Sequence, residues 1–217
     1  MLLSDSNAGQ RHPSHDPNNF AVSAEVGNLL AQLTIGALAV LLITSEYESG
    51  MIRASLTVVP RRLPVLWGKL GVLTAFTFAV AVASSFAAFT LGQAVWRAHG
   101  LKGFWFGDAD VTRIVLGSAL TLVVTAIFSL AVGALLRNTA AGITTVVGLL
   151  FVVPVLAAHV NAVADLSRFL PSNAGNALWG VTFSPVGMSP WNGFALFCGV
   201  AAALVAAAVW RLSRTDA

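Results

Sequence analysis

Long runs without a charged side chain divide this chain into apolar and polar stretches. The runs cover residues 26–45, 70–96, 114–136, 138–164 and 169–210. A helix needs about 20 apolar residues to cross the hydrocarbon of a bilayer, and each of the first four runs suits one helix. None of them alternates apolar and polar residues as lipid-facing β-strands do. Because backbone groups in lipid must be satisfied internally, the runs predict transmembrane helices.

The fifth run is too long for one span, and its first part is rich in helix breakers. Pro171, Pro185 and Pro190 lie there among several glycines, which is typical of a loop or a broken helix. One further span is therefore expected at the end of this run. The sequence thus predicts an all-α polytopic membrane protein with a polar external N-terminal segment at 1–25 and a cytoplasmic loop at 46–69. The five predicted transmembrane helices lie at about 26–45, 70–94, 114–136, 140–158 and 191–210.

Composition and charge agree with this class of protein. The chain is 57% hydrophobic and only 10% charged, with a mean hydropathy of +0.81, whereas soluble domains carry about 25% charged residues. With the 46–69 loop inside, the shorter cytoplasmic loops hold the denser positive charge, which the positive-inside rule favours. The cytoplasmic basic residues are then Arg53, Arg61, Arg62, Lys69, Arg137, Arg211 and Arg214, and the external ones are Arg11, Arg97, Lys102, Arg113 and Arg168. This orientation places the C-terminus in the cytoplasm. The net charge of +3 sets orientation in such a protein, and nucleic acid is not an expected partner.

The loop at 46–69 carries more polar detail than a simple connection needs. Three apolar residues, Ile52, Leu56 and Val59, fall on one face of a helix. Arg53 lies on another face, and Pro60 is a natural helix stop. Pro64 then suits the first turn of the next helix. The pattern predicts a short amphipathic helix at the cytoplasmic membrane surface, and by itself it also fits a helix that binds anionic lipid.

Several kinds of chemistry have no sequence signal. No predicted span holds an internal charged residue, which argues against a proton- or sodium-coupled carrier. The chain has no phosphate-binding Gly-rich loop, no HExxH and no CxxC, and no serine has a plausible histidine and acid partner on one side of the membrane. The single cysteine, Cys198, excludes an internal disulfide and suits a small packing residue. We expect no enzymatic activity in this chain.

Two local features refine the predicted helices. The polar turn at Arg137 and Asn138 is very short, which predicts an antiparallel hairpin of the third and fourth spans. Pro154 lies within the fourth span, where proline often kinks a membrane helix. The sequence leaves open whether such a kink lines a pathway or serves packing alone.

The stretch ITSEYESGMIRASLTVVPRRLPVLWGKL resembles the cytoplasmic loop of actinobacterial ABC transporter permeases of the type-2, exporter-like family. The matching positions are Glu46, Tyr47, Gly50, Ile52, Arg53, Leu56, Pro60, Arg61, Arg62 and Lys69. The segments ALLRNTAAGITTVVGLLFVVP and FLPSNAGNALWG are also similar to that family. The resemblance runs from about residue 20 to the C-terminus, and its specific part is the cytoplasmic block.

This resemblance implies a permease subunit of an ATP-driven transporter that exports a hydrophobic or amphipathic substrate. Family members have six spans, pair with a second permease subunit, and dock on separate cytoplasmic ATP-binding subunits that bind ATP and Mg. The coupling helix of the family would correspond to about 46–60 here, with Glu46, Gly50 and Arg53 as the first contact candidates. The wider set of partner-binding candidates is Glu46, Tyr47, Gly50, Ile52, Arg53, Leu56, Pro60, Arg61 and Arg62. The resemblance implies a multi-pass protein of the bacterial plasma membrane and no cofactor bound by this chain itself.

The first family span has no counterpart in this sequence, since residues 1–25 are polar and lack the apolar core of a signal peptide. We therefore expect a truncated chain, an internal start, or a partner that supplies the missing helix. Two other classes stay open: a membrane scaffold or resistance-type protein that does not transport, and an inactive permease fragment. A lipid-surface anchor that uses the basic block alone is a further alternative.

Overall fold

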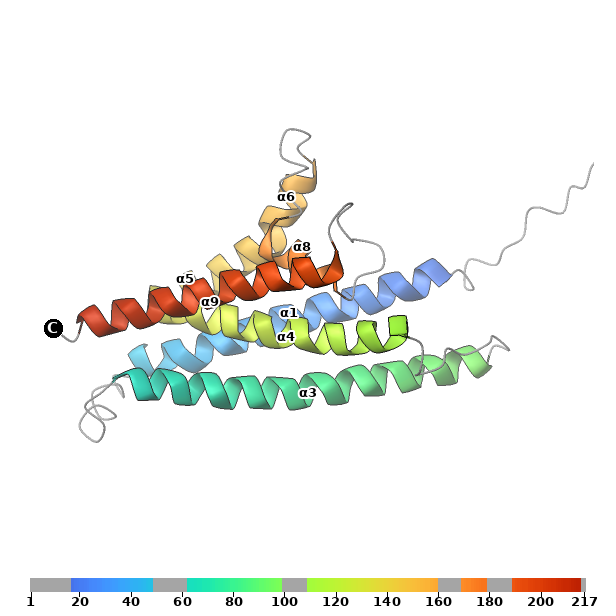
Figure 1. Cartoon of the computed structure of the whole chain (residues 1–217), viewed down its shortest axis with the longest axis horizontal. Coiled ribbons are helices and arrows are strands. Elements are labelled where there is room, and N and C mark those ends of the chain that lie inside the picture. Colours follow the sequence, from blue (N-terminus) through green and yellow to red (C-terminus); the bar gives the residue numbers. More distant parts are fainter. Residues whose placement is uncertain (1–16, 49–61, 99–108, 160–168, 179–188, 216–217) are drawn as a thin grey trace, which may run out of the picture.

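The protein is a bundle of long helices in a computed structural model, which describes residues 17–48, 62–98, 109–159, 169–178 and 189–215 (Figure 1). The helices are α1 (Pro17–Glu48), α3 (Arg62–Ala98), α4 (Ala109–Leu136), α5 (Thr139–Val147), the π-helical segment η2 (Gly148–Val152), α6 (Val153–His159), α8 (Pro171–Asn176) and α9 (Pro190–Thr215). In Figure 1, α1, α3, α4 and α9 run side by side, while α6 turns away from the bundle.

Five stretches of these helices are long and apolar enough to cross a membrane. They cover 27–45, 66–92, 115–136, 139–157 and 190–214. The prediction of an all-helical, multi-pass membrane protein with five long apolar helices is therefore confirmed. Of the predicted coupling helix at about 46–60, residues 46–48 form the end of α1, and the rest lies outside the described residues.

Several helices extend beyond the limits of the apolar runs, and the starts of α1 and α3 are examples. Helix α1 begins at Pro17, so residues 17–25 of the predicted polar segment are helical. Helix α3 begins at Arg62 and includes Pro64 in its first turn, as the sequence indicates. Both helices extend beyond their apolar part because a helix satisfies its own backbone hydrogen bonds in water as well as in lipid.

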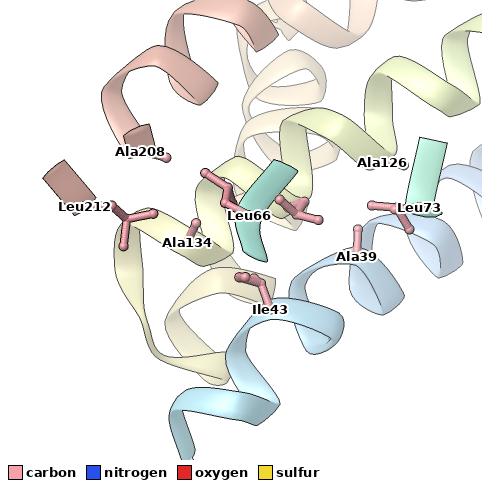
Figure 2. Close-up of a cluster of buried hydrophobic side chains, with 9 residues drawn as sticks. Ala39, Ile43, Leu66, Leu73, Ala126, Ala134, Ala208 and Leu212 are labelled. Atoms are coloured by element: carbon pink, nitrogen blue, oxygen red, sulfur yellow. The ribbon is translucent and has the colours of Figure 1, made fainter. Parts of the chain in front are cut away.

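Helix α4 is the centre of the bundle. In an 18-residue window of its membrane-length stretch 78% of the residues are buried, against 11% to 33% in the corresponding windows of the other four. One core cluster shows how the neighbours cover it (Figure 2): Ala39 and Ile43 of α1, Leu66 and Leu73 of α3, Ala126, Leu130 and Ala134 of α4, and Ala208 and Leu212 of α9. A second cluster holds Phe128 and Phe197, with Cys198 packed against it in the role that the sequence indicates. The outer helices leave large apolar side chains exposed, which suits contact with lipid.

Close contact of α1 with the α4–α5 hairpin depends on two glycines. A Cβ atom on Gly142 would lie 2.6 Å from Val40 Cγ1, and one on Gly133 would lie 2.7 Å from Ile43 Cγ2. Small residues let membrane helices approach this closely. The van der Waals contacts that result stabilise the helix pair, because lipid supplies no hydrophobic driving force for helix association. The two glycines therefore fix the position of α1 on the hairpin.

The turn between α4 and α5 is as short as the sequence predicts. Arg137 adopts a left-handed backbone with φ 55°, and its N–H donates to the Gly133 carbonyl at 2.9 Å. This is the αL arrangement that ends many helices, although glycine is the usual residue there. Asn138 then caps α5, because its Oδ1 accepts the Ala141 N–H at 2.9 Å.

The fourth span bends at Pro154. The Val153 N–H bonds to the Gly148 carbonyl, which makes one π-helical turn directly before the proline. A proline within an α-helix lacks its N–H and meets the carbonyl four residues earlier, here that of Leu150. The wider turn accommodates the ring, and α6 leaves the bundle beyond it (Figure 1).

The Pro- and Gly-rich segment before the last span contains a broken helix, one of its two predicted forms. Helix α8 packs against α9, where a Cβ on Gly193 would lie 2.5 Å from the Ala174 carbonyl oxygen. A Cβ on Gly175 would lie 2.6 Å from the Phe197 ring. The backbones of α8 and α9 are thus in direct contact.

We predict that Gly193→Ala destabilises the protein by about 1–3 kcal/mol, because the new methyl group meets a backbone carbonyl that cannot move alone. Gly199→Ala on the same helix is the matched control, since no atom lies within 4 Å of its Cβ position. The control is expected to be neutral or up to about 1 kcal/mol more stable. The measurement is unfolding by SDS in mixed micelles, followed by circular dichroism. Equal stability of the two variants would contradict the close α8–α9 contact.

Candidate functional site

The structure describes only part of the predicted partner-binding set. Glu46 and Tyr47 lie in the last turn of α1, and Arg62 is the first residue of α3. The other candidates lie outside the described residues: Gly50, Ile52, Arg53, Leu56, Pro60 and Arg61. The role of these residues stays a prediction. The described ends of α1 and α3 are the parts of the bundle that a partner bound at this segment would act on.

Polar contacts join the two helix ends that flank this segment to the rest of the bundle. The Lys69 ammonium of α3 donates to the Leu42 carbonyl of α1 at 2.6 Å. Thr139, at the start of α5, donates to the Thr44 hydroxyl of α1 at 2.7 Å. Beside these contacts, Ile43 and Leu66 lie in one apolar cluster (Figure 2). The end of α1 is therefore attached to both α3 and α5.

Basic side chains gather at the same end of the bundle. Arg211 of α9 donates to the Leu135 carbonyl in the last turn of α4. The last four carbonyls of a helix lack partners within the helix and lie at the negative end of its dipole, so a guanidinium is stabilising there. Arg214 stacks on the Trp210 ring, with its guanidinium carbon 4.3 Å from the ring centroid. Lys69, Arg137, Arg211 and Arg214 are thus near one end, which the sequence assigns to the cytoplasm.

A buried polar cluster that the sequence did not reveal lies around α8. The Gln32 amide of α1 is 2% exposed, and its Nε2 donates to Asn176 Oδ1 at 2.9 Å. Thr121 of α4 donates to its own helix at Gly117 O and lies 3.2 Å from the Gly175 carbonyl. These contacts tie α8 to α1 and α4.

Arg113 extends this polar cluster along α4. Its Nη1 donates to the Leu178 carbonyl, just after α8, at 2.8 Å. The sequence analysis placed Arg113 on the external side, just before the third predicted span. The structure places it within α4, where its hydrogen bond holds the region after α8. Ser172 Oγ and Asn28 Nδ2 are also buried, and neither has a hydrogen-bond partner among the described residues. The cluster can therefore offer uncharged donors and acceptors beside one cation.

One signal for this cluster was present in the sequence. Gln32 is an amide within an apolar span, and a buried amide in lipid requires a hydrogen-bond partner. The position of that partner, Asn176, depends on how α8 folds back against the bundle, which a single sequence does not fix. The described residues include no group of three or more His, Cys, Asp or Glu side chains that could hold a metal ion.

No protein-family model, no curated protein and no solved structure matches this chain. The assignment as a multi-pass helical membrane protein therefore depends on the helices of this structure. The similarity to transporter permeases depends on the motif residues alone.

We predict an energetic coupling between Gln32 and Asn176 of about 0.6 kcal/mol, and not above about 1.7 kcal/mol, as for other hydrogen bonds between membrane helices. The measurement is a double-mutant cycle of Gln32→Ala and Asn176→Ala, with stability determined by SDS unfolding. The control cycle pairs Gln32→Ala with Thr90→Ala, because Thr90 is exposed and bonds within its own helix. A coupling no larger than that of the control would show that the bond does not hold α8.

Proposed function

We propose that this chain is a membrane-spanning permease subunit of an ATP-driven ABC-type transporter. The observation that carries the proposal is the position of the motif-bearing segment. It follows α1 and precedes α3, and both helices pack on α4, which contacts each of the other four spans. A partner bound at that segment would therefore act on the centre of the bundle through two of its spans.

The proposed mechanism divides the work between two proteins. A separate cytoplasmic ATP-binding subunit binds ATP and Mg and receives the segment 46–60 in a surface groove, as a short amphipathic helix is suited to do. Its movement on binding ATP shifts the balance between two arrangements of the spans. A second permease subunit, identical or different, completes the pathway, and the direction of transport is export.

The described spans support a hydrophobic or amphipathic substrate. The buried polar groups between the spans are amides and hydroxyls, such as Gln32, Thr125 and Ser129. Uncharged groups of this kind offer hydrogen bonds to a substrate without the fixed charges that a proton- or sodium-coupled carrier uses. The energy for transport would then come from the partner rather than from an ion gradient across this chain.

We predict that an ATP-binding subunit is recovered when this protein is purified from native membranes through a C-terminal tag. Glu46→Gln and Arg53→Gln should each reduce its recovery, because both residues lie in the proposed contact segment. Arg214→Gln is the control, since it removes a charge at the same end of the bundle on α9. Recovery of the tagged chain alone, with and without the substitutions, would favour the scaffold alternative.

The same two substitutions should separate ATP hydrolysis from transport in the reconstituted complex. We expect hydrolysis to continue while transport falls, because the partner would turn over without moving α1 and α3. The measurement compares ATPase activity with substrate efflux from vesicles, and membrane insertion is checked by extraction in carbonate. Normal transport by both variants would contradict the coupling role of Glu46 and Arg53.

A further inference from the structure

The end of α9 has an unusual combination of charge, aromatic surface and position. Trp210 is 58% exposed, and the Arg214 guanidinium lies against its ring. Arg211, on the same turn of α9, reaches the Leu135 carbonyl of α4, two residues before Arg137. Three arginines and an exposed tryptophan therefore lie at one junction of two membrane-length helices.

Stacking leaves Arg214 able to bind an anion. A guanidinium on an aromatic ring uses its flat face, and its N–H donors point outward in the plane of the group. A phosphate diester accepts two such donors at once. Arg211 is held in place by the α4 carbonyl. It lies three residues before Arg214, a spacing that puts both side chains on one side of the helix.

The two helix ends that form the junction contain no acidic residue, and the nearest one along the chain is Asp216, two residues after Arg214. No Asp or Glu occurs between residues 111 and 159, or between 169 and 215. Helix α1 ends at the same side of the bundle with Glu46 and Glu48. Its main neighbours are α4, α5 and α3, whereas the main neighbours of α9 are α4, α8 and α3. Arg211 and Arg214 thus lie on a helix whose principal neighbours do not include the acidic end of α1.

The position of the junction selects the kind of anion. Trp210 and Leu136 are exposed apolar side chains at the ends of α9 and α4, and tryptophan is favoured at the boundary between hydrocarbon and headgroups. A soluble phosphate would use the charge and leave this apolar surface uncovered. A phospholipid covers both, since its headgroup meets the arginines and its acyl chain lies on Trp210 and Leu136.

We propose that Arg211, Arg214 and Trp210 form a binding site for the headgroup of an anionic phospholipid such as phosphatidylglycerol. The site is independent of the proposed transport function and of the 46–69 loop. It would hold the α4–α9 junction at the headgroup level on the side of the membrane that contains the C-terminus.

Fluorescence quenching by brominated lipids tests the proposal on the full chain in nanodiscs. Phosphatidylglycerol and phosphatidylcholine with the same brominated acyl chains are compared at equal mole fraction, and the Trp210 contribution is obtained as the difference between the native chain and Trp210→Phe. We expect phosphatidylglycerol to quench this contribution at a lower mole fraction than phosphatidylcholine. Arg214→Gln should weaken that preference about fivefold, the effect of one basic residue near an anionic surface.

Arg97→Gln is the matched control, because it removes one positive charge at the opposite end of the bundle, in the last turn of α3. Equal quenching by both lipids, or an equal loss of preference in the control, would overturn the proposal. Arg211→Gln gives a second independent test if Arg214→Gln inserts poorly. Displacement of the quencher by soluble glycerol 3-phosphate would assign the site to a free anion and would also overturn it.

Discussion

The fold depends on the coverage of α4 by its neighbours. Lipid is as apolar as a leucine side chain, so apolar burial alone does not draw helices together in a membrane. The bundle instead combines close backbone contacts with a few polar bonds. Gly133 and Gly142 bring α1 against the α4–α5 hairpin, while Ser85 and Ser118 join α3 to α4 at 3.0 Å. Helix α9 is attached through Arg211 at one end and through the α8 contact at the other.

Both ends of the bundle use a cation bonded to a backbone carbonyl, and the end at α8 adds an amide pair and a hydroxyl. At one end, cations on α3 and α9 bond to backbone carbonyls of α1 and α4. At the other end, Gln32, Thr121 and Arg113 hold α8 in place. Charged groups at helix ends reach water and headgroups, so they need little burial. Amides and hydroxyls carry the deeper contacts, because their desolvation costs much less than that of an ion.

The sequence predicted the number and approximate position of the spans because hydropathy and length directly determine which helices cross a membrane. It also predicted the short Arg137–Asn138 turn, since that link leaves room only for a hairpin. It did not predict the Gln32–Asn176 bond or the α8–α9 contact. Both join residues far apart in the chain, and Gly175 and Gly193 resemble many other small residues in these spans until their neighbours are known. The partner-binding residues were recognised by motif, and their geometry lies outside the described residues except at Glu46, Tyr47 and Arg62.

The packing of the two flanking helices also bears on how a partner would move them. Helix α1 is held closely by Gly133 and Gly142 and bonds to Thr139 near its end, so α1, α4 and α5 form one tightly packed unit. Helix α3 has only 11% of an 18-residue apolar window buried. Its glycines Gly68 and Gly71 have no atom of a neighbouring helix within 4 Å of a Cβ position. Displacing α3 therefore breaks fewer close contacts than displacing α1. Under the proposed function, a force on the segment between them would move α3 against the α1–α4–α5 unit, with Lys69 and Ser85 as the contacts that resist it.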